Sequence, residues 1–355
     1  MIFLRKKLFC VFLIILLILP ISVFADSSKS SIVMDLNSGR ILYQHNANDQ
    51  RLIASITKIM TAILAIEHGN LNNKVTVGEE VLSMYGTNIY VEVGEKLSML
   101  DLIYGLLLRS GNDAAVIIAK EVGGSEKKFV QMMNAKAKEI GMKNTEFQNP
   151  HGLDEVTQNY STAYDMALLS KYAFSNKLYR KIVATKKYEV STGKKTYLWY
   201  NRNRLLNEYE YCNGGKNGYT PSAGKTLVTT AAKDNLNLTI VSLGDGDSYN
   251  NHQNLYEEIF SKYHRYKIVD KNNFVVSKDF SNQDVYLKES FYYPLMDSEV
   301  KEVRTVIHFF DRVSSNHVGV VNIFLNNRKI GSLPIYAKEK KKEKFSFLQW
   351  LRDLV

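Results

Sequence analysis

Strand-like segments stand at both ends of a long helical stretch, and this order restricts the fold more than any other feature of the sequence. Near the start, residues 31–35 and 41–43 flank the turn signal at 37–40, a pattern that predicts a β-hairpin. Much later, residues 227–232 and 238–243 are apolar in the way strands are. Strands so distant in sequence, with helices between them, indicate an α/β fold with helices packed on a mostly antiparallel sheet.

The stretch between these strands carries apolar residues at helical spacing. Its first helix is expected to begin at Ser55 and to run to about His68, because the stop signal Gly69-Asn70 follows. We also expect helices at residues 100–108, 112–122, 127–140, 161–174 and 254–263, and a strand at 187–191.

The chain changes character again at about Ile268, where short alternating runs are separated by Asn, Asp and Ser turns. Such runs predict a small all-β domain over residues 268–336, after a first domain that covers residues 26–265. The runs that we interpret as strands are residues 274–276, 285–287, 303–307, 318–323 and 329–331.

Residues 1–25 have the layout of a secretory signal peptide. Basic residues at 5–7 precede an apolar run over 8–24, and compact residues allow cleavage after Ala25. The run is short for a membrane span, although an uncleaved anchor stays an alternative. Cleavage lowers the formal net charge from +10 to +7. A basic exported protein is expected to meet an anionic wall or membrane surface and no nucleic acid.

The C-terminal segment, residues 338–355, forms a third zone. A basic run at 338–344 precedes apolar residues such as Phe345 and Leu348, which fall on one side of a helix with Gln349 opposite. A basic flank and an apolar face are typical of an amphipathic helix that anchors a protein in a membrane interface. The segment is too short to span a bilayer, and docking on the protein itself is the alternative.

Cys212 is the only cysteine outside the signal segment, so no intramolecular disulfide can form in the mature chain. Avoidance of cysteine fits an oxidising exterior. We interpret Cys212 as a buried, inert residue of a strand. A reactive thiol stays an alternative, because Lys216, a candidate site residue, follows closely.

Ser55 and Lys58 form the first of three motifs that point to chemistry. Their spacing puts the serine hydroxyl and the lysine amine on one face of a helix, close enough to share a proton. A serine hydroxyl is a weak nucleophile until a base takes its proton, and a lysine kept neutral by burial can be that base. The helix N-terminus would also stabilise an oxyanion.

Each of the three motifs is weak when taken alone, and Ser55 with Lys58 could be an ordinary helix cap. Ser110 and Asn112 stand between two helices, where they can relay a proton and hold a substrate amide. Lys216 offers a cation for a carboxylate, and Gly218 lets a ligand backbone come close to the strand. In order and spacing, the three motifs match the Ser-x-x-Lys, Ser-Asp-Asn and Lys-Thr-Gly set of class A β-lactamases and penicillin-binding proteins.

Beyond these motifs, the region from residue 30 to about residue 263 resembles the D-alanyl-D-alanine carboxypeptidases among the low-molecular-mass penicillin-binding proteins. The resemblance implies a β-lactamase/transpeptidase-like domain, a β-rich second domain and an amphipathic C-terminal anchor. It also implies a secreted, extracytoplasmic protein attached to the outer face of the cytoplasmic membrane. The matching blocks are residues 31–35, 54–62, 108–115, 149–153 and 160–167.

The resemblance implies that the protein removes the terminal D-alanine from peptidoglycan stem peptides that end in D-Ala-D-Ala. Ser55 would attack the carbonyl of the penultimate D-alanine, and Lys58 would be the general base. Ser110 would pass the proton toward the leaving amine, while Asn112 would hold the peptide and orient Lys58. β-Lactam antibiotics would bind at the same site, and no metal or organic cofactor is implied.

The resemblance also implies how the carboxylate end of the substrate is bound. Lys216 would hold the carboxylate, with Asn217 and Gly218 beside it, and the backbone N–H groups of Ser55 and Tyr219 would form the oxyanion hole. The family usually has threonine where this chain has Asn217. An asparagine can still donate through its amide, but it is longer and its geometry differs.

Two alternatives to a working carboxypeptidase stay open at this point. The substitution at Asn217 permits a catalytically weak module that senses or holds cell-wall peptide or β-lactam. The second alternative, which the sequence favours less, is a β-lactamase, for which Asp154 and Glu155 are the available carboxylates. The loop that carries them matches the carboxypeptidase block instead.

Overall fold

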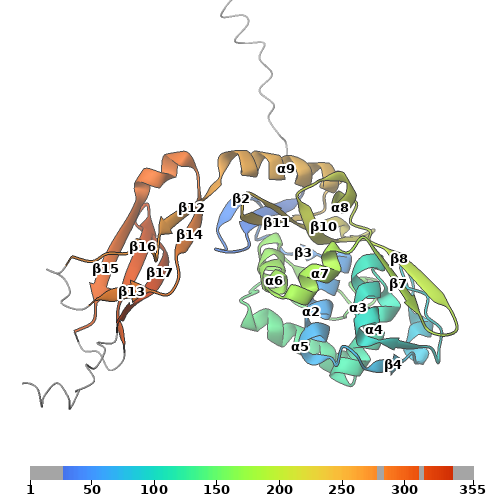
Figure 1. Ribbon diagram of the computed structural model, residues 1–355. Coiled ribbons are helices and arrows are strands. Elements are labelled where there is room, and N and C mark those ends of the chain that lie inside the picture. Colours follow the sequence, from blue (N-terminus) through green and yellow to red (C-terminus); the bar gives the residue numbers. More distant parts are fainter. Residues whose placement is uncertain (1–26, 278–283, 312–315, 339–355) are drawn as a thin grey trace, which may run out of the picture.

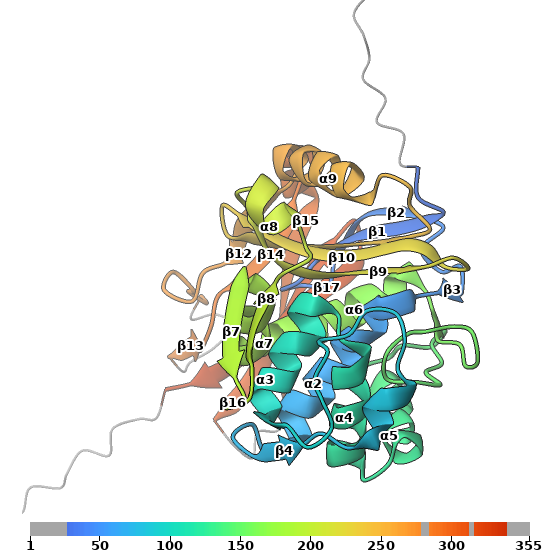
Figure 2. The same cartoon turned by 90° about the vertical axis from the view of Figure 1, so that its right-hand side faces the viewer.

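The computed structural model describes residues 27–277, 284–311 and 316–338. An antiparallel five-stranded sheet with the strand order β2-β1-β11-β10-β9 organises the first region (Figures 1 and 2). The sheet brings the two ends of this region together, since Val33 lies opposite Ile240. The prediction of an antiparallel sheet flanked by helices is confirmed. The strands are β1 (Ser30–Asp35), β2 (Ile41–His45), β9 (Cys212–Thr220), β10 (Gly224–Lys233) and β11 (Leu236–Leu243).

Helices cover both faces of this sheet. Successive side chains of a strand point to opposite faces, and β1 shows the consequence. Ile32 and Met34 belong to one buried cluster with helix α6 (Ala163–Ser175), while Val33 belongs to a second cluster with helix α9 (Ser248–Lys262). All six residues of β1 are therefore buried.

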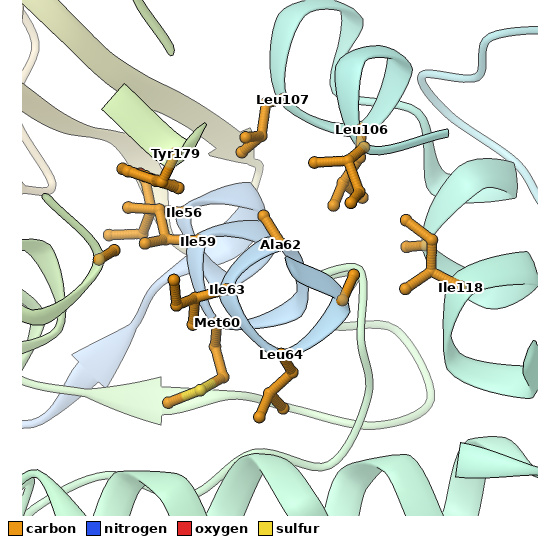
Figure 3. Close-up of a cluster of buried hydrophobic side chains, with 14 of the residues drawn as sticks. Ile56, Ile59, Met60, Ala62, Ile63, Leu64, Leu106, Leu107, Ile118 and Tyr179 are labelled. Atoms are coloured by element: carbon orange, nitrogen blue, oxygen red, sulfur yellow. The ribbon is translucent and has the colours of Figure 1, made fainter. Parts of the chain in front are cut away.

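Helix α2 (Lys58–His68) lies inside the helical layer, and its first eight residues, Lys58 to Ala65, are all buried. These residues are mostly apolar, as a helix surrounded by other elements requires. Figure 3 shows Ile59 and Ile63 on one side of this helix near Tyr179, with Leu106 and Ile118 from other elements around it. The other helices are α3 (Met99–Tyr104), α4 (Asn112–Gly123), α5 (Glu126–Glu139), α7 (Lys177–Ala184) and α8 (Leu205–Glu208).

Helix boundaries differ from the sequence expectation at one important place. The α-helix starts at Lys58, and Ser55 lies in a preceding 3₁₀ turn, η1 (Ala54–Thr57). The helix expected at residues 100–108 is α3 continued by a π-helical turn, η3 (Gly105–Arg109). The remaining short elements of this region are β3 (Arg51–Leu52), β4 (Lys74–Thr76), η2 (Glu79–Ser83), β5 (Lys96–Ser98), β6 (Tyr160–Ser161), β7 (Lys187–Ser191) and β8 (Thr196–Tyr200).

The described C-terminal residues form two small sheets with hydrophobic clusters of their own, as the expectation of an all-β region required. Residues 274–276 are not a strand, so that expectation is wrong. The strands at residues 264–269 and 291–295 were not predicted. They pair with each other, and each finds its partner more than twenty residues away in the sequence. The elements are β12 (His264–Val269), β13 (Val285–Leu287), β14 (Phe291–Leu295), η4 (Asp297–Glu302), β15 (Val303–Phe309), β16 (His317–Leu325) and β17 (Arg328–Ala337).

Arg40, in the turn of the first hairpin, joins the two regions. Its guanidinium donates to the carbonyl oxygen of Pro294 at 2.6 Å and to both carboxylate oxygens of Glu299, at 2.5 and 3.1 Å. The rings of Tyr263 and Tyr293 lie 5.3 Å from the same guanidinium, close enough for cation–π attraction.

Candidate active site

The local backbone places Ser55 directly in front of helix α2. The preceding residue, Ala54, has a φ of +49°, a strained conformation for a residue with a Cβ. The Nζ atom of Lys58 lies 3.0 Å from the Oγ atom of Ser55. The two groups that the sequence paired by spacing are therefore in hydrogen-bond contact.

Lys58 is completely buried, and its amine has further fixed partners. It donates to Oδ1 of Asn112 at 2.7 Å and to the carbonyl oxygen of His151 at 2.5 Å. Burial lowers the pKa of Lys58 to about 7, against the attraction of Asp113, and the positive charge of Arg202 lowers it further. A substantial neutral fraction near pH 7 is what a lysine needs to act as a base.

Asn112 is held in one orientation. It begins helix α4, and its side-chain amide donates to the carbonyl oxygen of Tyr85 at 2.7 Å, which leaves Oδ1 to face Lys58. Ser110 ends the π-helical turn two residues earlier, where a left-handed conformation with φ +69° turns the chain sharply into α4. Ser110 and Asn112 are both buried.

Lys216 lies in strand β9, beside η1, and is 2% exposed. Its Nζ atom donates to the carbonyl oxygen of Asn217 at 2.6 Å. Burial holds the pKa of Lys216 well below its ordinary value, and the charges of Lys58 and Arg202 lower it further. An anion bound beside Lys216 would therefore stabilise the charged form of its amine.

Gly218 also makes room for a close contact within the chain itself. A Cβ at this position would lie 2.6 Å from Oγ1 of Thr226 and 2.8 Å from the backbone nitrogen of Ser55. Gly218 thus lets β9 pack against the chain's own backbone at Ser55. Tyr219, the next residue, is 65% exposed.

Comparison with known proteins agrees with this arrangement. Residues 22–247 match the family model described as D-alanyl-D-alanine carboxypeptidase. The D-alanyl-D-alanine carboxypeptidase DacF of Bacillus subtilis is 31% identical over 93% of this chain and 90% of its own length. The chain belongs to the D-alanyl-D-alanine carboxypeptidase family. It is therefore a serine-type peptidase, as the sequence predicted.

Solved structures support the fold of this carboxypeptidase. The carboxypeptidase DacD of Francisella tularensis is 29% identical with a TM-score of 0.67, covering 91% of this chain and 95% of the other. Penicillin binding protein 5 of Haemophilus influenzae, 24% identical, shares the fold with a TM-score of 0.75 over 90% of this chain and 99% of its own. Some other curated relatives align over only 56% to 58% of their length.

Sequence reasoning missed the carbonyl of His151 as a partner of Lys58. A loop network holds that carbonyl in place: Oγ1 of Thr61 donates to the carbonyl of Pro150 at 2.6 Å, and the Gly152 amide donates to Oδ1 of Asn149 at 2.6 Å. Burial, and then the charge of Lys58, lowers the pKa of the His151 ring to about 3. The ring is thus neutral. The family block matched at 149–153 indicated that this loop belongs to the site, but it did not indicate which atom of the loop contacts Lys58.

Asp113 and Arg202 are two further charged residues of the carboxypeptidase that sequence reasoning did not assign. The Asp113 carboxylate is buried and accepts hydrogen bonds from the backbone amides of Ile89, Tyr90 and Ala114 at 2.8 to 2.9 Å. It therefore fastens the loop that also carries Tyr85. The guanidinium of Arg202 donates to Oγ1 of Thr87 at 3.1 Å.

Cys212 lies at the start of strand β9 and is partly buried. Burial raises the pKa of its thiol, which favours the unreactive protonated form. The side chain of Asn203 and the carbonyl of Gly214 contact its sulfur at 3.7 and 3.6 Å. These surroundings support the interpretation of Cys212 as an inert strand residue.

Proposed function

We propose that Ser55 is the nucleophile of a D-alanyl-D-alanine carboxypeptidase and that Lys58 is its general base. One observation carries this proposal: the buried Lys58 amine, with a pKa of about 7, lies 3.0 Å from the Ser55 hydroxyl. The amine is held there by Asn112 and His151, so little reorganisation is needed when the proton moves.

In the acylation step, Lys58 accepts the Ser55 proton while Oγ bonds to the carbonyl carbon of the penultimate D-alanine. The resulting oxyanion accepts hydrogen bonds from the backbone N–H groups of Ser55 and Tyr219. The peptide C–N bond then breaks, and the proton passes from Lys58 through Ser110 to the leaving nitrogen of D-alanine. The stem peptide is left as an ester on Ser55.

Deacylation reverses these proton movements. Lys58 takes a proton from water as the water oxygen bonds to the ester carbon. The bond between that carbon and Oγ of Ser55 then breaks, and Lys58 returns the proton to Oγ. Lys216, beside Asn217 and Gly218, holds the terminal carboxylate of the incoming substrate. The pKa of Lys216, lowered by burial in the free protein, would rise when that anion binds.

Release of free D-alanine from a diacyl-L-Lys-D-Ala-D-Ala peptide tests the proposal, with Ser55→Ala as the control. Release above the control is expected. Equal, negligible release from the unsubstituted protein and from Ser55→Ala would exclude carboxypeptidase activity on this peptide. The alternative function, a module that binds cell-wall peptide or penicillin without hydrolysing the peptide, would then be favoured.

A β-lactamase would instead turn penicillin over rapidly with little lasting acyl-enzyme. The structure argues against Asp154 as the deacylating carboxylate. Its Oδ2 accepts a hydrogen bond from the hydroxyl of Thr220 at 2.6 Å and is therefore already engaged. A stable penicilloyl adduct that disappears in Ser55→Ala is the expected result.

We further propose that the carboxypeptidase is exported and attached to the outer face of the cytoplasmic membrane. The signal peptide (residues 1–25) and the amphipathic anchor (338–355) support this by sequence, and both lie outside the described residues except for Lys338. Within the part of the chain that the structure describes, no helix has the length and apolar character to cross a bilayer.

A further inference from the structure

Four aromatic rings form a continuous row across the four-stranded C-terminal sheet, whose order is β13-β17-β16-β15. We name Tyr286, Tyr336, His317 and Phe310 the aromatic row. Its neighbouring ring centroids are 5.7 Å apart for Tyr286 and Tyr336, 5.5 Å for Tyr336 and His317, and 5.1 Å for His317 and Phe310. Each strand of the sheet, or the residue just after it, thus contributes one ring.

The row reaches solvent at the edge formed by β15. Phe310 is 37% exposed, and Val306 and His308, which alternate with it on the same face of β15, are exposed too. Val306 is 52% exposed. The apolar faces of these rings, with an uncovered apolar neighbour, cost solvation free energy unless another surface covers them.

The chain leaves the described structure beside this row. The Lys338 amide donates to the carbonyl of Asp284 at 2.8 Å, and the Ala337 amide donates to that of Asn316 at 2.8 Å. The segment that follows contains, with Lys338, six basic and three acidic residues and ends in an apolar stretch with Trp350. Figure 1 shows this end of the sheet away from the helical layer around α2.

A lysine lies against one of these rings within the described residues as well. The Nζ atom of Lys288 lies 3.9 Å from the ring centre of Tyr336. Rings with an apolar body and a polar edge, close to lysines, suit the boundary between lipid headgroups and acyl chains. Lysines there are attracted by anionic headgroups.

We propose that the aromatic row is a second contact with an anionic lipid bilayer, next to the C-terminal anchor. The inference rests on the proposed attachment through residues 338–355, whose starting point sets the row at the bilayer surface. Two adjacent contacts would restrict the orientation of the C-terminal sheet relative to the bilayer. A single short helix would leave that orientation free.

Binding of the chain over residues 26–355 to vesicles of phosphatidylglycerol and phosphatidylcholine tests the inference. Replacing both Phe310 and Tyr286 by serine should raise the dissociation constant by roughly fivefold to tenfold, since apolar ring area no longer leaves water. The matched control is Val300→Ser, which changes a 39% exposed apolar residue of η4 and should leave binding unchanged.

The outcomes separate the two proposals. If the unsubstituted chain does not bind the vesicles, the attachment itself is wrong and this inference with it. If it binds and the double variant binds equally well, only the aromatic contact is wrong. Thermal unfolding would show whether the double variant is folded.

A second readout does not depend on removing the rings. Phe310→Trp should be quenched by brominated lipid in the vesicles, whereas Val300→Trp should not, with the other tryptophans common to both proteins. Equal quenching at the two positions would overturn the aromatic contact.

Discussion

Gly218 of strand β9 packs against the backbone nitrogen of Ser55, so closely that a Cβ at position 218 would lie 2.8 Å from that nitrogen. A Cβ at Gly152 would lie 3.0 Å from the same nitrogen and 2.0 Å from the carbonyl oxygen of Ala54. Two glycine backbones therefore pack closely against the turn that presents Ser55.

Replacing Gly218 by alanine should lower the acylation rate by roughly tenfold to a hundredfold, because β9 must move away from Ser55. The rate of labelling by a fluorescent penicillin measures this effect. Gly246→Ala is the matched control, since a Cβ there meets nothing within 4 Å. Unchanged labelling of Gly218→Ala would contradict the tight contact.

The pH dependence of kcat/KM should report the protonation of Lys58. Its pKa of about 7 lies far below the ordinary lysine value, so activity should rise as the pH increases through about 7 and the amine loses its proton. Measurement of D-alanine release between pH 5 and pH 9 would show this rise. Activity that is flat across this range would exclude Lys58 as the titrating base.

Two charge substitutions should move this rise in opposite directions. Asp113→Asn removes a negative charge that raises the pKa of Lys58, so the rise should shift to lower pH. Arg202→Ala removes a positive charge that lowers this pKa, so the rise should shift to higher pH. If either variant loses activity and its pH profile does not shift, Asp113 and Arg202 act only through the loop contacts that they make.

Replacing Asn217 by threonine, the residue that the family usually has there, should raise kcat/KM. Lys216 contacts the backbone oxygen of Asn217, a contact that any residue at 217 preserves. A threonine hydroxyl would add one hydrogen bond to the substrate carboxylate, so Asn217→Thr should raise kcat/KM roughly threefold to tenfold. Asn217→Ala is the comparison, and equal activity of the two variants would exclude a contribution from the hydroxyl.

Breaking the link between the two regions should cost stability. The Arg40 and Glu299 side chains are each 14% exposed and joined by two charge-assisted hydrogen bonds. Arg40→Ala should therefore lower the free energy of unfolding by about 2 kcal/mol. Lys262→Ala removes an exposed helical ion pair with Glu258 and should cost less than about 0.5 kcal/mol. Chemical denaturation measures both, and similar losses would contradict the importance of burial.

Much of the fold follows from local pattern. Helix α6 covers most of the helix expected at residues 161–174, and a local contact caps its start, since the hydroxyl of Thr162 accepts the Asp165 amide at 3.0 Å. By contrast, β12 and β14 have no comparable local signal, and β14 contains Pro294, which weakens any strand prediction. Their pairing is visible only once the chain has folded back.

The same division applies to the candidate site. The pairing of Ser55 with Lys58 follows from a spacing of three residues and was predictable. The His151 carbonyl was not, because a backbone oxygen carries no sequence signature. The conformation of Ser110, with its positive φ, likewise depends on the π-helical turn before it.

The sequence by itself thus determined which residues are the candidates for catalysis and substrate binding: Ser55, Lys58, Ser110, Asn112 and Lys216, in an order that is typical of the family. Only the tertiary structure decided the state of those groups. The pKa of Lys58 depends on removal of water by atoms that are distant in sequence. Likewise, the position of Ser55 depends on Gly218 approaching from a strand formed much later in the chain. Desolvation and close packing are properties of the assembled chain, so no local motif contains them.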